Sequence, residues 1–165
     1  DYEMILKKTR EYPIVSIAPV DGNIFPTITF DSYEGGRLAA ETLVESGFTQ
    51  FGIITGPLIK WEANLRKNGF SDALRIKGYE INWEFQGNYS FNSGEAAYED
   101  INKNELTNIG IFSSNDQMAL GFLHTALENG AVNEGDPGPR SDGNYYGYFR
   151  DLDGNKITAR CLVGK

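Results

Sequence analysis

The stretch Ile109-Gly-Ile-Phe-Ser-Ser-Asn-Asp116, followed by a strongly apolar run, decides the fold class that we expect for this 165-residue chain. Its first four residues form a short apolar run, which is typical of a buried strand. Asn115 and Asp116 then stand where a side-chain oxygen can cap a helix, and apolar residues from Met118 to Leu127 indicate that helix. A strand that passes directly into a helix is the repeating unit of parallel sheets.

The same alternation of strands and helices runs upstream of this stretch. Gly47 and Gly78 each follow a helical pattern and are the expected C-caps, because glycine accepts the left-handed conformation found there. The alternation predicts an α/β fold with a parallel sheet. The expected strands are 14–18 (buried), 27–30, 51–55 and 81–85, and the expected helices are 32–46, 62–77 and 92–102.

The pattern changes after Gly130. Residues 135–139 are rich in glycine and proline and form a candidate linker. Residues 145–150 and 156–163 then read as an antiparallel β-hairpin, because Asp153-Gly154 is a strong turn signal. The formal net charge of −8 lies wholly in residues 1–129, since the remaining segment carries five acidic and five basic residues.

Composition excludes several classes of protein. With 23 Asp and Glu against 15 Lys and Arg, the chain lacks the basic surface that binds nucleic acid. One Cys cannot form an internal disulfide, and one Cys with one His cannot build a structural zinc site. No apolar run approaches the ~20 residues of a membrane-spanning helix, and no signal-peptide pattern opens the chain. We expect a cytoplasmic, non-enzymatic domain with no metal site, no cofactor and no membrane contact, and the initial Asp suggests that an upstream segment has been removed.

Four residues are candidates for ligand contacts. Asn115 and Asp116 follow a strand and precede a helix, the place where ligands bind in open parallel sheets, although both could merely cap the helix. Arg66 near a helix start opposes the helix dipole, so its donors could serve a polyol or a carboxylate, or it could be a solvated surface residue. Tyr89 follows a strand and could stack on a sugar or be a buried aromatic.

The first 129 residues resemble the effector-binding domain of the lactose/galactose repressor (LacI/GalR) family. The resemblance rests on five motifs: Phe30-Asp-Ser-Tyr-Glu-Gly-Gly-Arg-Leu-Ala-Ala40, Phe51-Gly-Ile-Ile-Thr-Gly-Pro57, Arg66-x-x-Gly-Phe70, Gly87-Asn-Tyr-Ser90 and Ser114-Asn-Asp-x-Met-Ala-Leu-Gly121. It implies a periplasmic-binding-protein-like (Rossmann-like) fold whose two lobes hold a small effector, usually a sugar. The resemblance implies effector contacts at Arg66, Tyr89 and Asn115, with Asp116 as a further candidate.

The chain departs from that family after Gly130. The last 35 or so residues resemble the end of a glyoxalase/bleomycin-resistance (vicinal oxygen chelate) domain, although Thr158 stands where that family often has a metal-binding Glu. We therefore expect a chimera of partial lobes: 1–57 as a remnant of the N-terminal lobe, 58–129 as the C-terminal lobe, and 130–165 as a glyoxalase-like hairpin. The hairpin would cover the sheet edge exposed after residues 109–112.

The leading expectation is a fragment that binds a sugar or related metabolite and lacks the DNA-binding headpiece. Such a chain would not bind operator DNA by itself and would form a homo-oligomer. Two alternatives stay open: a glyoxalase-like metal-dependent enzyme fragment, and a recombined fold without retained activity.

Overall fold

The computed structural model describes residues 7–8, 12–17, 25–101, 109–133, 138–139, 145–150 and 156–161. The chain divides into two compact units, Asp1–Asp31 and Ser32–Lys165. The division expected between residues 57 and 58 falls inside the second unit. Each unit is described separately below.

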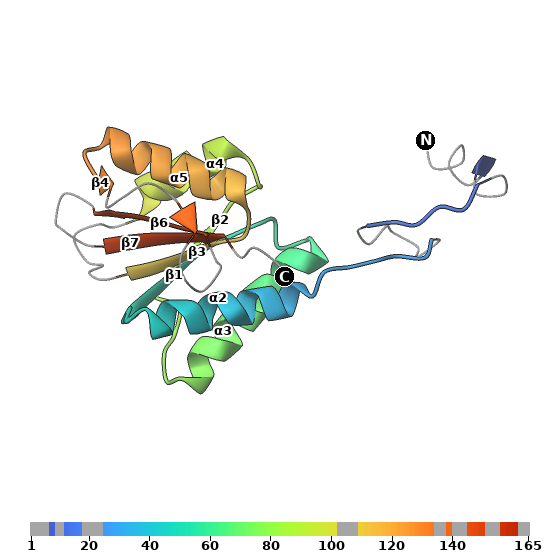
Figure 1. Ribbon diagram of the computed structural model, residues 1–165, viewed down its shortest axis with the longest axis horizontal. Helices are drawn as coiled ribbons and strands as arrows, with labels where there is room; N and C mark the ends of the chain where they lie inside the picture. Colours follow the sequence, from blue (N-terminus) through green and yellow to red (C-terminus); the bar gives the residue numbers. More distant parts are fainter. Residues whose placement is uncertain are drawn as a thin grey trace. The chain divides into compact units, whose positions relative to one another are not determined.

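The second unit is built on a three-stranded parallel sheet (Figure 1). Its strands are β1 (Gln50–Thr55), β2 (Trp83–Gln86) and β3 (Ile109–Ser113), in the order β2-β1-β3. β1 pairs in parallel with both neighbours, so that Ile54 lies opposite Phe85 and Ser113. The parallel sheet expected from the alternation of strands and helices is confirmed.

Helices cover both faces of this sheet. Figure 1 shows α2 (Ser32–Glu45) and α3 (Trp61–Ile76) on one face, and α4 (Phe91–Asp100) and α5 (Asp116–Glu128) on the other. Alternate residues of β1 serve the two faces: Phe51 and Ile53 pack in the cluster with α2 and α3, whereas Ile54 packs in the cluster with α4 and α5. A strand buried on both faces needs a continuous apolar run, as 51–54 provides.

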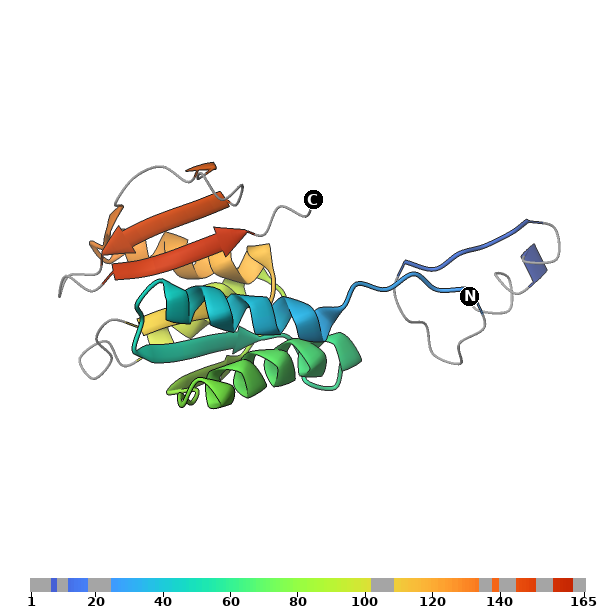
Figure 2. The ribbon, with the colours of Figure 1, turned by 60° about the horizontal axis from the view of Figure 1, so that its bottom comes forward.

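Each helix pair crosses at glycines. An added Cβ at Gly36 of α2 would collide with the backbone carbonyl of Arg66, and one at Gly69 of α3 would collide with that of Tyr33. Gly94 of α4 and Gly121 of α5 stand equally close to the backbone of the partner helix. Both pairs therefore pack backbone against backbone, as the side-by-side course of α2 and α3 in Figure 2 illustrates.

The helix ends agree with the sequence expectations. The observed bounds of α2, α3 and α4 differ from the expected ones by one or two residues. Gly47 and Gly78 have φ of 85° and 83°, which confirms both as left-handed C-caps.

The expectation of a buried strand at 14–18 is wrong for the residues that the structure describes. Only an isolated parallel bridge joins Ser16 to Thr27, and Ile17 is 79% exposed. The neighbouring run 27–30 likewise forms no strand beyond that bridge, and Phe30 is 85% exposed. Apolar runs become buried strands only when other elements cover their faces, and no described residue of 1–31 forms such a layer. Ala18 lies outside the described residues.

The C-terminal segment has its own antiparallel sheet. β4 (Val132–Asn133) and β5 (Gly138–Pro139) both pair with β6 (Tyr145–Arg150), and β6 also pairs with β7 (Lys156–Cys161). The expected turn at Asp153-Gly154 and most of the expected linker lie outside the described residues. β7 lies beside β3, but no ladder between these two strands joins the sheets, so β3 stays an edge strand of the parallel sheet.

Candidate functional site

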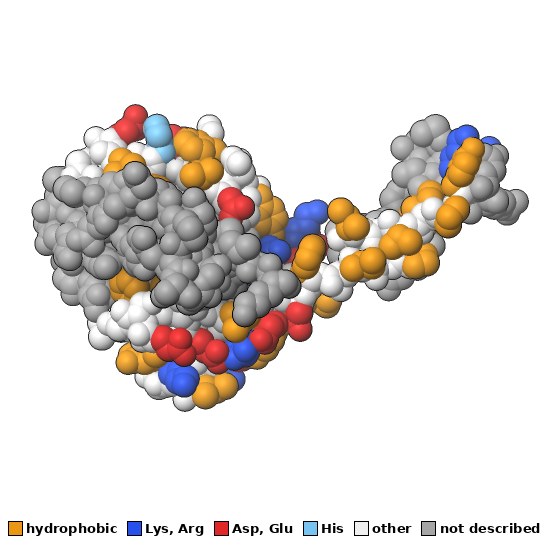
Figure 3. Space-filling model, in the orientation of Figure 1, with side chains coloured by type: hydrophobic (Ala, Val, Ile, Leu, Met, Phe, Trp, Pro, Cys, Tyr) orange, Lys and Arg blue, Asp and Glu red, His pale blue; other side chains and the backbone are white. Residues whose placement is uncertain are grey.

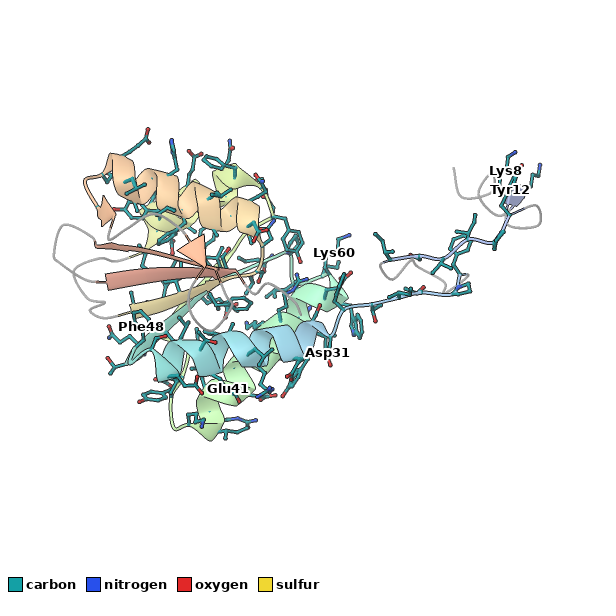
Figure 4. The ribbon with its side chains drawn as sticks, in the orientation of Figure 1. Lys8, Tyr12, Asp31, Glu41, Phe48 and Lys60 are labelled. Carbon is teal, nitrogen blue, oxygen red and sulfur yellow. The ribbon has the colours of Figure 1, made fainter. Side chains whose placement is uncertain are left out.

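The carboxyl ends of the three parallel strands share one edge of the sheet, which we call the carboxyl edge. The loops that leave it are 56–60 after β1, 87–90 after β2 and 114–115 after β3. Figure 4 shows Lys60, which precedes α3, at this edge, and Phe48, which precedes β1, at the opposite end of the sheet. Three helix N-termini, those of α3, α4 and α5, therefore begin at the carboxyl edge.

Tyr89 has an unusual backbone in the loop after β2. Its φ of 70° is the one positive value for a non-glycine residue among those that the structure describes. Residues with a Cβ adopt this left-handed region at a cost of about 1–3 kcal/mol, and such residues cluster at functional sites. The aromatic ring packs over Gly56, where any Cβ would collide with ring atoms and the hydroxyl.

Two charged residues of α3 act on the Tyr89 hydroxyl. Partial burial raises the pKa of Tyr89, the positive charge of Arg66 lowers it, and the negative charge of Glu62 raises it. The structure thus brings Arg66 and Tyr89 together, as the candidate site requires, and adds Glu62. Its spacing from Arg66, one helical turn along α3, could have indicated this residue.

Asn115 joins the same group through its side-chain amide. Its Oδ1 accepts a hydrogen bond from the backbone N–H of Met118 (3.1 Å), which caps α5. Its Nδ2 donates to the carbonyl oxygen of Tyr89 (2.9 Å). The capping alternative is therefore realised, but it uses only one of the two polar atoms of the side chain.

Asp116 stands apart from this group. It is the first residue of α5 and is exposed, and its carboxylate forms no ion pair with any residue in the described part of the chain. A carboxylate in the first helical turn is favoured by the helix dipole whether or not a ligand is present. Its role in binding stays a prediction.

Two buried hydroxyl groups lie at the same edge. Thr55 ends β1 and is fully buried, Ser114 follows β3 and is 7% exposed, and neither hydroxyl has a hydrogen-bond partner among the residues that the structure describes. Sequence reasoning missed both, because the partners of a hydroxyl depend on tertiary packing and leave no signal in the residue pattern. Trp61, the first residue of α3, is 58% exposed.

The described residues contain no group of three or more His, Cys, Asp or Glu that could hold a metal ion. Among the same residues, no helix is both long and apolar enough to span a membrane. The polar groups at the carboxyl edge are instead an aromatic ring, a guanidinium, a carboxylate and an amide. Together these groups can donate and accept hydrogen bonds and can stack on an apolar surface.

The chain is similar in sequence and in fold to several transcription regulators. The chain is 37% identical over 128 residues to the ribose operon repressor of Escherichia coli (strain K12). The aligned region covers 75% of this chain and 38% of the repressor. A dimeric lac repressor with a C-terminal deletion has 26% sequence identity and a TM-score of 0.63, with 78% of this chain and 47% of that chain covered. A cellobiose complex of the transcriptional regulator CelR has 26% identity and a TM-score of 0.59, with 63% and 32% covered.

The chain thus spans well under half of the length of the curated repressor that it resembles. A family model matches residues 40–131, a range that includes α3, α4, α5 and all three strands of the parallel sheet. Because this match covers more than half of the chain, the protein belongs to the periplasmic binding protein-like domain family.

Proposed function

We propose that this chain binds a small hydroxyl-rich metabolite, most simply a sugar, at the carboxyl edge of its parallel sheet. It would do so as part of the effector-binding domain of a LacI/GalR-type transcription regulator. The observation that carries the proposal is the convergence of Arg66, Tyr89 and Asn115, from three different loops or helices, at one edge of the sheet. The similarity to a regulator solved with cellobiose supports a sugar as the ligand class.

The chemistry of the group suits a sugar. The Tyr89 ring offers an apolar face to the C–H bonds of a pyranose or furanose. Arg66 can donate several hydrogen bonds from its planar guanidinium group. The Glu62 carboxylate can accept hydrogen bonds, and the Asn115 amide can still form hydrogen bonds beyond the two that it makes within the protein. Asp116 would add an acceptor at the N-terminus of α5.

The same proposal divides the chain into three segments of different origin. Residues 1–57 would derive from the N-terminal lobe, 58–129 from the C-terminal lobe and 130–165 from a glyoxalase-like hairpin. The separate antiparallel sheet of the last segment and its neutral charge support the final division. The negative charge of the remainder supports the proposal that this chain does not itself contact DNA.

The whole regulator would act in the cytoplasm as a homo-oligomer without enzymatic activity. The repressor relatives support this proposal, and the related lac repressor is a dimer. Sedimentation of the chain with and without ligand would test its oligomeric state. A monomer in both conditions would contradict this part of the proposal.

A thermal-shift screen followed by calorimetry tests ligand binding. A panel of pentoses, hexoses and disaccharides is compared with a panel of divalent metals, and a sugar is expected to raise the melting temperature. Arg66→Ala should abolish the shift, whereas Arg75→Ala, which removes an exposed arginine nearer the C-terminal end of the same helix, should retain it. No sugar-dependent shift, or an undiminished shift in Arg66→Ala, would reject the proposal, and a shift with metals alone would favour the glyoxalase-like enzyme.

A further inference from the structure

The strained backbone of Tyr89 requires neighbours that hold it. A tyrosine left to itself avoids a φ of 70°, because its Cβ crowds the backbone in the left-handed region. Such a conformation persists only where surrounding contacts over-determine it. The loop around Tyr89 contains contacts of this kind on both sides.

On one side, the loop is tied to the start of α4. Asn88 Oδ1 accepts a hydrogen bond from the backbone N–H of Ser90 (2.9 Å), so that a turn closes over Tyr89. Ser90 in turn caps α4 by accepting from the backbone N–H of Ser93 (3.2 Å). These contacts fix the residues flanking Tyr89 but leave its own carbonyl group to another partner.

On the other side, that partner is Asn115. Its Nδ2 donates to the Tyr89 carbonyl oxygen, while its Oδ1 is held by the backbone N–H of Met118 at the start of α5. The cap fixes the side chain in place, so its amide reaches the Tyr89 carbonyl from a rigid position. The position of Tyr89 is thereby tied to the N-termini of both α4 and α5.

The ring of Tyr89 packs against Gly56, and we call this the seated position of the ring. The atoms Cζ, Cε1 and the hydroxyl stand in the space that any Cβ at residue 56 would need. The hydroxyl then lies within the electrostatic influence of Glu62 and Arg66 on α3. Backbone conformation and ring position are therefore linked: a change of φ at Tyr89 would lift the ring from Gly56.

We propose that Asn115 is a positioning residue, which holds Tyr89 in its left-handed conformation and so keeps the ring seated on Gly56 before any ligand arrives. Asn115 acts through Tyr89 in this role, in addition to any contact of its own with a ligand. The consequence for affinity rests on the proposed function, because a preset ring binds a sugar without first paying the entropy of being ordered. The positioning itself does not depend on a ligand.

Asn115→Asp separates positioning from capping. Aspartate is as good an N-cap as asparagine, so α5 should stay intact, but a carboxylate cannot donate to the Tyr89 carbonyl. Ser90→Asp is the matched control, because it retains a cap at α4 and adds the same charge at the same edge. Asn115→Ser repeats the separation without a charge, in case the aspartate variant folds poorly.

The measurement is made by NMR on the ligand-free chain. Backbone chemical shifts report the φ of Tyr89, and nuclear Overhauser effects between its ring and the Gly56 Hα protons report the seated ring. In Asn115→Asp and Asn115→Ser the ratio of seated to unseated ring should fall about threefold to tenfold, as loss of one hydrogen bond implies. Ser90→Asp should leave both signals unchanged.

The outcomes for the two proposals are distinguishable. An unchanged φ and unchanged Overhauser effects in both Asn115 variants would overturn the positioning role, whatever the sugar affinity. Equal loss in Ser90→Asp would also overturn it, because charge alone would then explain the effect. A wild-type chain that binds no sugar would reject the proposed function only, whereas Gly56→Ala should unseat the ring with Asn115 intact and weaken any sugar binding that exists.

Discussion

The helix pair α2 and α3 packs in the same way as the helix pair α4 and α5. The two pairs differ in the N-caps with which their helices begin at the carboxyl edge. Both pairs bring backbones together at glycines, Gly36 with Gly69 and Gly94 with Gly121. On the α4 and α5 side, both helices begin with side-chain caps, and one of them also holds Tyr89. On the other side, Lys60 is the N-cap residue of α3 and makes no side-chain cap hydrogen bond.

Charged side chains of α2 and α3 also interact within that helix layer. Arg37 of α2 pairs with Glu34 and Glu41 of the same helix, and the Tyr33 hydroxyl donates to Asp72 of α3. Figure 3 shows acidic and basic side chains gathered over this helix layer. Close packing is common to both layers, whereas the side-chain N-caps next to the Tyr89 loop are those of α4 and α5. The layer of α2 and α3 contributes the charged groups Glu62 and Arg66 instead.

The largest expected effect comes from adding a methyl group at the glycines where paired helices touch. Gly36→Ala and Gly94→Ala should each lower the free energy of unfolding by about 3 kcal/mol, because the new methyl group meets backbone that cannot move aside. Gly35→Ala is the control, since its Cβ would meet nothing within 4 Å, and it should stabilise by about 0.5–1 kcal/mol. Denaturant unfolding measures all three. A mild effect at Gly36 with a severe one at Gly94 would show that the two layers are not equally close-packed.

A smaller effect is expected from the unpartnered hydroxyl of Thr55, which follows Ile53 on the face of α2 and α3. Thr55→Val should raise the free energy of unfolding by about 1–2 kcal/mol, because it removes a buried polar group that makes no hydrogen bond to any residue in the described ranges. Thr125→Val on α5 is the matched comparison and should destabilise by about 1 kcal/mol, since that hydroxyl donates to the Gly121 carbonyl. Destabilisation in Thr55→Val would show that a bridging water satisfies the hydroxyl.

The helix caps should show opposite signs in the two layers. Ser90→Ala should lower the free energy of unfolding by about 1 kcal/mol, because α4 loses the acceptor for the Ser93 N–H. Lys60→Ser should raise it by about 0.5–1 kcal/mol, because α3 gains a cap where it has none. Thermal unfolding of both variants tests this prediction. Destabilisation by Lys60→Ser would mean that the lysine makes a contact worth more than a cap.

The smallest expected effect is a change in the ionisation of Tyr89. Burial raises the pKa of this hydroxyl above its ordinary value of 10.0, and Arg66 opposes the rise. Arg66→Gln should therefore raise the pKa further, and Glu62→Gln should lower it. Because the pKa is raised in the folded chain, the associated stability is present below pH 10 and is lost as the pH rises through the folded value. Ultraviolet difference titration against Tyr89→Phe measures the shift, and Arg75→Gln should leave it unchanged.

Much of the second unit could be predicted from residue pattern alone. The three parallel strands and the ends of α2, α3 and α4 follow from apolar runs, capping residues and glycines, which are local signals. The position of the candidate site also followed, because parallel strands end at one edge. The pairing of Arg66 with Tyr89 was expected only through family resemblance, and Glu62 was missed.

Other features could not be predicted, because they depend on what lies across from a residue. Runs 14–18 and 27–30 have the pattern of buried strands, yet no described residue of the first unit covers them, and four of their apolar side chains are exposed: Val15, Ile17, Ile28 and Phe30. Trp61 is exposed for a similar reason: an apolar side chain is buried only when a partner surface exists.

For the second unit, residue pattern alone predicts the three parallel strands, the helices that cover them and the loops that meet at the carboxyl edge, since propensity, capping and chain direction are local properties. Only the tertiary structure decided how these loops are used. The left-handed backbone of Tyr89, its seat on Gly56 and its bond to Asn115 join residues from three loops. The turn between Asn88 and Ser90 is local, but the bond from Asn115 and the contact with Gly56 come from distant loops, so the strained conformation depends on the tertiary fold.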